Sequence, residues 1–275
     1  MNNLNFGCGD RICLDNWTNL DFHSHHPSVV QHNLLEGFPF QDRSFTAVYS
    51  SHVLEHFPLP EAHFLLQESF RVLKPGGIIR IVVPDLENTC REYVRILDAY
   101  DSDPLARRQH QWILIEMLDQ MVRNRPSGMV PDFKKQIFEQ NDHEIIAYVK
   151  GRTQNTPWTQ PPKGSFIDRL RKLHPAKVKE KLLYLWVRAV RLLLPKALRQ
   201  FAIDDTPLGE KHRWMYDRHS LESALEAAGF ISLSFKSHST SNITNFHASD
   251  LDSHADGSPY KNNSIYAEAM KSEDL

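Results

Sequence analysis

Two glycines near the N-terminus and an aspartate that follows them have the types and spacing needed for ligand chemistry. Gly7 and Gly9 flank Cys8 directly after the apolar run 4–6, and Asp21 lies twelve residues after Gly9. Because glycine lacks a Cβ atom, a ligand can approach the backbone of such a turn closely. A carboxylate at the end of the next strand can accept hydrogen bonds from both hydroxyls of a ribose. The pattern therefore indicates a cofactor that contains a nucleoside.

A dinucleotide fits these residues less well than S-adenosylmethionine does. The dinucleotide fingerprint has a third glycine where this chain has Ile12. In that fingerprint the acidic residue lies about 20 residues after the glycines, whereas Asp21 follows Gly9 by only twelve. Only residues 10–16 separate the turn from the second strand, so we expect a first helix of no more than one or two turns. A pyrophosphate favours a full helix N-terminus. S-adenosylmethionine carries no phosphate and does not need one.

His52, Glu55 and His56 form a second group of residues that could do chemistry. Two histidines four residues apart on one helix face can bind zinc, with the glutamate as base. A catalytic zinc needs a third protein ligand, and no second acidic motif supplies one, so we predict no metal site. A zinc hydrolase stays open as an alternative function. The run 23–26, which holds three further histidines, is expected to be a polar loop.

A neutral histidine can also remove a proton near pH 7. His52, His56 and, much later in the chain, His212 are therefore candidate catalytic bases, and Glu55 could orient one of them. Which of the three acts as the base stays open.

The elements that must position these residues alternate between strands and helices. Such alternation is typical of βαβ units and a parallel sheet. The expected strands cover 4–6, 17–22, 28–31, 45–50, 78–84, 230–236 and 264–270, and the expected helices cover 60–73 and 220–228. A polar loop is expected over 237–263.

Residues 86–201 interrupt the sheet pattern, which predicts a domain formed by 1–85 and 202–275 with a helical insertion between them. The pattern is helical over 86–148 and indicates a loop over 151–165. Segment 166–201 contains ten Lys or Arg residues against two acidic ones, alternating with apolar residues. It could lie on a membrane surface through its basic residues, or cover the first domain as a lid.

The composition of the whole chain limits its partners. Its 275 residues carry a formal net charge of -2, which gives no reason to expect nucleic acid. Three cysteines without framework spacing fit a reducing compartment, and neither a leader nor a membrane-spanning run is evident. We therefore expect a cytoplasmic protein, with peripheral contact to the inner membrane through 166–201 as an open alternative. The oligomeric state is not indicated.

Several motifs resemble the class I, Rossmann-like S-adenosylmethionine-dependent methyltransferases, and most closely the type-11-like group often associated with glycan and cell-envelope biosynthesis. The motifs are Leu4–Gly9 with Trp17–Asp21, Tyr49–His56, Arg71–Gly77 and Gly209–Tyr216. The resemblance implies an α/β fold with a doubly wound, mostly parallel sheet, an antiparallel last strand and a helical insertion. It also implies S-adenosylmethionine as the cofactor.

The same resemblance implies roles for single residues. The turn would hold the methionine end, Asp21 the ribose and the next motif the adenine, while the end of the fourth strand would lie beneath the sulfonium. The implied cofactor-binding residues are Phe6, Gly7, Cys8, Gly9, Asp21, Asn33, Leu34, Ser51 and His52. Asn33 stands where the family usually has an aspartate, and its amide oxygen can accept the same hydrogen bond. Thr46 stands where the family usually has an acidic residue at the start of the fourth strand.

We therefore expect methyl transfer from S-adenosylmethionine to a small molecule, a sugar or a lipid-linked glycan. A protein that binds S-adenosylmethionine without turnover is the alternative. The acceptor, and whether nitrogen, oxygen or carbon is methylated, stay open because a fold does not determine its substrate.

Overall fold

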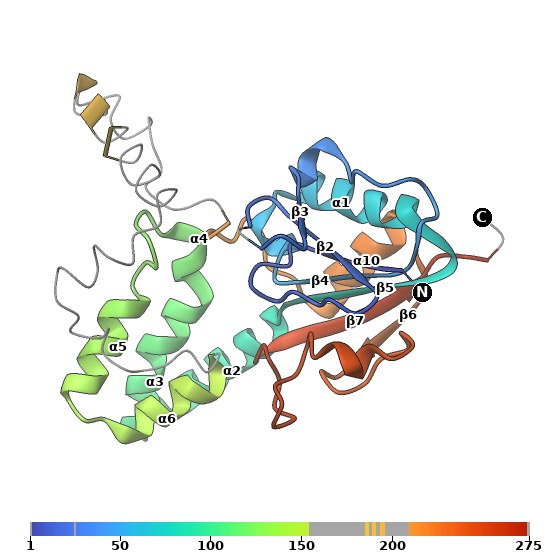
Figure 1. Ribbon diagram of the computed structural model, residues 1–275. Coiled ribbons are helices and arrows are strands. Elements are labelled where there is room, and N and C mark those ends of the chain that lie inside the picture. Colours follow the sequence, from blue (N-terminus) through green and yellow to red (C-terminus); the bar gives the residue numbers. More distant parts are fainter. Residues whose placement is uncertain are drawn as a thin grey trace.

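A seven-stranded mixed sheet organises the computed structural model, which describes residues 2–24, 26–153 and 209–273, with only short stretches between 185 and 195. The strands are β1 (Asn3–Phe6), β2 (Trp17–Asp21), β3 (Val29–Gln31), β4 (Phe45–Ser51), β5 (Leu73–Pro84), β6 (Ile231–Lys236) and β7 (Ser264–Met270). Their order in the sheet is β3-β2-β1-β4-β5-β7-β6. β1 to β5 are parallel, and β7 runs antiparallel to both of its neighbours (Figure 1). The predicted fold class is confirmed.

The chain reverses its direction across the sheet between β1 and β4. In open parallel sheets, ligands bind in the crevice outside the carboxyl ends of the strands at such a switch point. β1 can lie at the centre because Leu4 and Phe6 are completely buried. The topology therefore places the end of β1, with its glycine turn, at the position expected of a binding site.

The expected short helix after β1 is absent, and residues 10–16 form a loop instead. Two buried asparagines hold this loop. Asn5 donates to the carbonyl of Arg11 at 2.9 Å, while Asn19 bonds both the amide and the carbonyl of Cys13 at 3.1 and 2.7 Å. These side chains satisfy backbone groups that a helix would have paired internally, so the loop is stable without helical hydrogen bonds.

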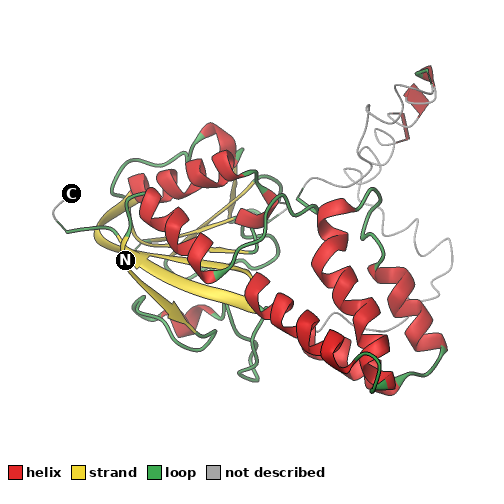
Figure 2. Ribbon diagram, turned by 180° about the vertical axis from the view of Figure 1, so that it is seen from behind, coloured by secondary structure: helices red, strands yellow, loops and turns green. Residues whose placement is uncertain are grey.

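Helices cover one face of the sheet, and a long irregular segment covers the other. α1 (Leu59–Val72) and α10 (Arg218–Ala227) lie together on the first face (Figure 2). The segment between β6 and β7 packs against the second face through Phe246 and Leu251 and contains the short 3-10 helix η4 (Phe246–Ser249). α10 begins two residues before its predicted start because Asp217 accepts a hydrogen bond from the amide of Ser220 and forms a capping box.

A second group of helices follows β5 and lies beside the sheet (Figure 1). Its elements are α2 (Leu86–Ala99), α3 (Pro104–Leu114), η3 (Ile115–Asp119), α4 (Gln120–Val122), α5 (Val130–Glu139) and α6 (His143–Arg152). Their shared core contains Trp112, Phe133 and Ile145. The helical pattern predicted for 86–148 is thus present. The predicted loop 151–165, beyond its first three residues, and nearly all of the basic segment 166–201 lie outside the described residues.

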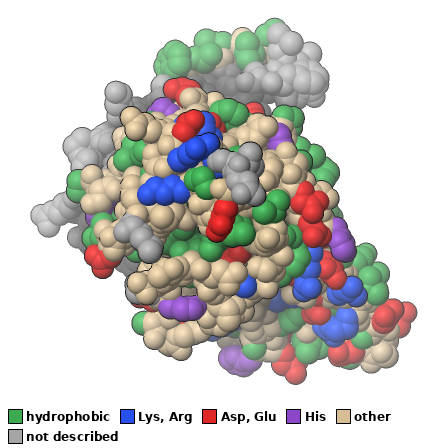
Figure 3. Space-filling view, turned by 90° about the vertical axis from the view of Figure 1, so that its right-hand side faces the viewer, with side chains coloured by type: hydrophobic (Ala, Val, Ile, Leu, Met, Phe, Trp, Pro, Cys, Tyr) green, Lys and Arg blue, Asp and Glu red, His purple; other side chains and the backbone are tan. Residues whose placement is uncertain are grey.

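In the view of Figure 3, acidic and basic side chains are scattered among other residues. No large patch of a single charge sign is visible on this face in the part of the chain that the structure describes. Among the helices that the structure describes, none combines the length and the apolar character needed to cross a bilayer.

Candidate cofactor and acceptor site

The glycine turn at the end of β1 has the backbone conformation that glycine tolerates best. Gly7 and Gly9 have φ angles of 65° and 51°. A Cβ atom on Gly7 would lie 2.3 Å from a methyl group of Val53, so only glycine fits there. The amide of Gly7 also donates to the carbonyl of Leu20 at 2.8 Å. The turn is therefore held against the end of β2.

Asp21 at the end of β2 is oriented by two backbone amides. One carboxylate oxygen accepts from the amide of Gly9 at 2.8 Å, and the other accepts from the amide of His23 at 3.1 Å. A carboxylate oxygen can accept more than one hydrogen bond. Asp21 therefore keeps the capacity to accept two ribose hydroxyls.

A first cavity of about 200 Å³ lies beside the glycine turn. Of the predicted cofactor-binding residues, Gly7, Cys8, Gly9, Ser51 and His52 line it. Burial raises the pKa of the Cys8 thiol to about 12, so the thiol is neutral under ordinary conditions.

Four other predicted cofactor-binding residues lie outside the lining of this cavity. Phe6 is completely buried in the core, and Leu34 is also buried. Asp21 is adjacent to the turn through its bond with Gly9. Asn33 caps the 3-10 helix η1 (Leu34–Glu36), because its side-chain oxygen accepts from the amide of Leu35 at 3.2 Å. The structure thus gathers the residues of the turn and of the end of β4 around this cavity, and Asn33 and Leu34 are not among its lining residues.

Three lining residues of the first cavity come from the segment before β7, which the sequence pattern marked only as a polar loop. They are Leu251, Tyr260 and Lys261. The guanidinium of Arg11 lies 3.6 Å from the centre of the Tyr260 ring, which joins this segment to the loop after β1. Neither periodicity nor a motif distinguishes these residues in the sequence.

A second cavity, of about 480 Å³, lies between the sheet edge and the helices after β5. His52 and Lys261 line both cavities. The remaining lining is mostly polar and includes His56, Thr89, Glu116, Gln120, Arg123, Arg152, Asn262, Asn263 and His212. The two cavities therefore meet at His52 and Lys261.

The segment from His52 to His56 is not an α-helix, so its two histidines do not share one helix face. His52 has a φ angle of 55°, and a 3-10 helix, η2 (Leu54–His56), follows. Both imidazoles nevertheless approach Glu55. The Nδ1 atom of His52 lies 3.3 Å from Oε1 of Glu55, and the Nε2 atom of His56 lies 3.9 Å from the same oxygen.

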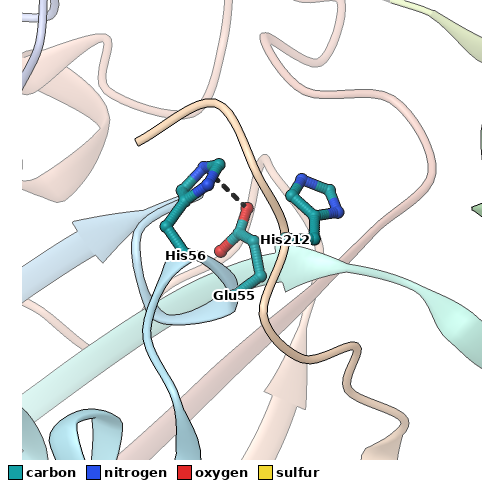
Figure 4. A group of neighbouring side chains, drawn as sticks. All are labelled: Glu55, His56 and His212. Carbon is teal, nitrogen blue, oxygen red and sulfur yellow. Dashed lines mark ion pairs between the residues drawn. The ribbon is translucent and has the colours of Figure 1, made fainter. Parts of the chain in front are cut away.

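His212 reaches this group because the segment 209–216 wraps around it. The amides of Arg213 and Trp214 donate to the carbonyl of Glu55 at 2.6 and 3.2 Å. The amide of His212 donates to the carbonyl of Gln120 at 3.0 Å. The ring of His212 then lies 5.1 Å from the ring of His56, centre to centre (Figure 4). Three of the four predicted catalytic residues, Glu55, His56 and His212, thus form one cluster, with His52 at its edge.

Burial controls protonation throughout this cluster. It lowers the pKa of His52 well below its usual value, lowers that of His56, and with the nearby His56 lowers that of His212 to about 3. It raises the pKa of Glu55 to about 8. The three imidazoles are consequently neutral at pH 7.

Comparisons with known proteins find similarity in the part of the chain that contains the glycine turn. Residues 5–81 match a family model described as a methyltransferase domain. The sterol 24-C-methyltransferase erg6 of Aspergillus fumigatus is 34% identical over 145 residues, which cover 52% of this chain and 34% of that protein. The match thus spans about a third of the length of this relative.

Two solved structures are similar along nearly the whole chain at low identity. A SAM-dependent methyltransferase from Methanosarcina mazei has 13% identity and a TM-score of 0.39, covering 98% of this chain and 92% of that one. A possible histamine N-methyltransferase from Thermotoga maritima has 11% identity and a TM-score of 0.37, covering 98% and 82%. These scores are below 0.5, so the structural similarity carries no argument of its own. The sequence match shows that residues 5–81, little more than a quarter of the chain, are similar to a methyltransferase domain, and it indicates S-adenosylmethionine as the cofactor.

Proposed function

We propose that this chain transfers a methyl group from S-adenosylmethionine to a hydroxyl of a polar, sugar-like acceptor. The observation that carries this proposal is the meeting of the two cavities at His52 and Lys261. A methyl donor held at the glycine turn would have its methyl group near this junction, and the second cavity has room for an acceptor on the other side. Methyl transfer requires this alignment of donor and nucleophile.

The polar lining of the second cavity supports a polar acceptor. Only Pro84 and Met215 are apolar among its described lining residues. Arg152 forms a two-pronged ion pair with Glu116 at 2.7 and 2.8 Å, and Asn263 donates to the same glutamate at 2.9 Å. Such fixed donors and acceptors suit hydroxyl groups, whereas an apolar ligand favours a mainly apolar pocket. A sterol acceptor is therefore less suited to this cavity than a sugar.

The residues at the junction can assist the reaction in a simple way. The methyl group already sits on a cationic sulfur, so the protein must align it and remove one proton. The S–CH₃ bond breaks as the O–CH₃ bond forms, S-adenosylhomocysteine leaves, and the hydroxyl proton passes to an imidazole and then to solvent. His52 is the first candidate for this base because it lines both cavities. Its Nδ1 atom lies 3.3 Å from Glu55, and its Nε2 atom lies 2.9 Å from the hydroxyl of Ser264, which the acceptor hydroxyl would have to displace.

Formation of S-adenosylhomocysteine with a panel of acceptors tests the proposal. We expect S-adenosylmethionine to bind in isothermal titration, and we expect product with sugars or sugar nucleotides but not with sterols. His52→Ala should lower turnover most, because it removes the proposed base, whereas His56→Ala and His212→Ala should lower turnover and leave the affinity for S-adenosylmethionine nearly unchanged. The exposed His219→Ala is the control. If the chain binds S-adenosylmethionine but forms no product with any class of acceptor or with an extract of the source cell, that result would support the alternative of a binding protein without turnover.

A lipid-linked glycan would combine a polar head for this cavity with contact to a membrane, the alternative that the basic segment 166–201 leaves open beside a lid. Flotation of the full chain with anionic liposomes at low salt tests this contact. If the chain does not bind the liposomes, the proposal of a sugar acceptor still stands, but the proposal of a lipid-linked acceptor is contradicted.

A further inference from the structure

We propose that Glu55, His56 and His212 bind one divalent transition-metal ion, with an open coordination position facing the second cavity. Each residue offers one ligand atom, and these atoms all lie within 4.8 Å of one another. Figure 4 shows the carboxylate of Glu55 between the two imidazoles. His212 is the third ligand that the spacing of the sequence motif did not provide.

The burial of Glu55 is the strongest argument for a cation. Its side chain is completely buried, and neither carboxylate oxygen has a hydrogen-bond partner. Burying a carboxyl group with neither oxygen hydrogen-bonded is costly in either protonation state, and in native proteins such groups are nearly always paired or coordinate metals. A cation between the carboxylate and the imidazoles would remove this cost.

The other buried carboxylates of the described residues show what a structural role looks like. Asp252 and Glu268 both pair with Arg80, at 2.6 and 2.8 Å. Asp119 pairs with Arg123 at 2.8 Å. The ion-pair contacts of Glu55 are with imidazole nitrogens, and they are longer, at 3.3 and 3.9 Å. It therefore differs from every other buried carboxylate in that part of the chain.

His56 is held in the orientation of a metal ligand. Its Nδ1 atom lies 3.0 Å from the carbonyl oxygen of Lys211. A carbonyl can only accept, so Nδ1 carries the proton and Nε2, which faces Glu55, carries the free lone pair. Metal-binding histidines are usually fixed in this way, with the other ring nitrogen donating to a carbonyl or a carboxylate.

The ligand set and its distances suit zinc or a similar ion. Two histidines and one glutamate are the protein ligands of several catalytic zinc sites, in which the fourth position is open. Around a tetrahedral ion with metal–ligand bonds of about 2.1 Å, two ligand atoms lie about 3.4 Å apart, so closing the site from separations of up to 4.8 Å requires the side chains to approach one another by about 1 Å or more. His56 and His212 line the second cavity, which places the open position on that side.

A metal at this position would also explain how the acceptor is activated. A bound cation lowers the pKa of a hydroxyl that coordinates it, so the acceptor would lose its proton more readily before methyl transfer. This role depends on the proposed function. The binding of the metal does not, because it can be measured without S-adenosylmethionine or an acceptor.

Titration of the chelator-treated full-length chain with cobalt chloride tests the site, since cobalt reports its coordination by absorbance. We expect one equivalent of cobalt per chain, displaced by zinc. His212→Ala and Glu55→Gln should weaken cobalt binding about tenfold or more. The exposed His219→Ala should bind like the unaltered chain.

A second measurement keeps the test decisive where a variant folds poorly. Zinc should raise the melting temperature of the unaltered chain and of His219→Ala, because a ligand that binds only the folded state stabilises it. At the same zinc concentration it should raise that of His212→Ala clearly less. Absence of stoichiometric cobalt in the unaltered chain, or equal cobalt affinity in His212→Ala, overturns the proposal. If the chain binds one equivalent of metal but forms S-adenosylhomocysteine equally fast after the metal is removed, the metal site is supported. Only the role of the metal in the reaction is then contradicted.

Discussion

The backbone amide of Gly9 donates a 2.8 Å hydrogen bond to the carboxylate of Asp21. This bond connects the turn after β1 to the end of β2, so the two parts of the cofactor site hold one another in place. A loss at either position should therefore affect S-adenosylmethionine binding beyond the loss of a single contact.

We predict that Asp21→Ala lowers the affinity for S-adenosylmethionine by about 100-fold or more. The substitution removes the acceptor of two ribose hydroxyls and releases the amides of Gly9 and His23. Hydrogen bonds to a charged group contribute about 1.5–3 kcal/mol each. Isothermal titration measures the change, and Asp15→Ala, which alters an exposed carboxylate on the neighbouring loop, is the control. Equal affinity in the two variants would exclude Asp21 from the ribose site.

The two glycines of the turn should respond differently to alanine. At Gly7, the new Cβ would lie 2.3 Å from Val53, whereas at Gly9 it would meet nothing within 4 Å. Both residues have positive φ angles, which cost an alanine about 1–2 kcal/mol. Gly9→Ala should therefore lose about that amount of stability in urea unfolding, and Gly7→Ala clearly more. A smaller loss for Gly7→Ala would mean that Val53 moves aside freely.

The parts of the fold that were predictable from sequence are those encoded locally. β1, β4 and β7 begin and end within a residue of their expected positions because runs of buried residues mark them. The glycine turn was equally visible, since its conformation depends on its own residues. The loop 10–16 was mistaken for a short helix because the side chains that hold it, Asn5 and Asn19, lie on neighbouring strands.

The parts that could not be predicted depend on contacts between distant segments. The segment 237–263 has no periodicity, yet it covers one face of the sheet and supplies Lys261 to both cavities. Similarly, His212 was a candidate by its type, but only the folded chain places it beside Glu55 and His56. A spacing rule along the chain cannot identify a group of residues brought together by wrapping of the segment 209–216.

The guanidinium of Arg80 holds the segment after β6 on the sheet, and we predict that Arg80→Met costs about 3–5 kcal/mol of unfolding free energy. Arg80 is completely buried, pairs with Asp252 and Glu268, and donates to the carbonyls of Ser237 and Thr240. Its removal leaves two buried carboxylates without their cation. Urea unfolding provides the measurement. Arg91→Met, in which the lost arginine is exposed, should change stability by less than about 0.5 kcal/mol.

We predict that Cys8 resists alkylation near neutral pH although it lines the cofactor cavity. The thiolate is the reactive form, and burial raises the pKa of the Cys8 thiol to about 12. At pH 8 this leaves about one thiolate in ten thousand, and the fraction rises about tenfold for each pH unit up to about 12. Mass spectrometry after iodoacetamide treatment should thus find the exposed Cys90 labelled and Cys8 unlabelled at pH 8.

Unfolding provides the control for this experiment, because in urea the Cys8 thiol is solvated and should be labelled like Cys90. Labelling of Cys8 in the folded chain should also increase between pH 8 and pH 9.5 and decrease when S-adenosylmethionine is added, since the cofactor occupies the cavity that Cys8 lines. If Cys8 in the folded chain were alkylated as fast as Cys90 at pH 8, its thiol would not be buried beside the turn. Protection by S-adenosylmethionine at the higher pH would connect the glycine turn directly to the methyl donor.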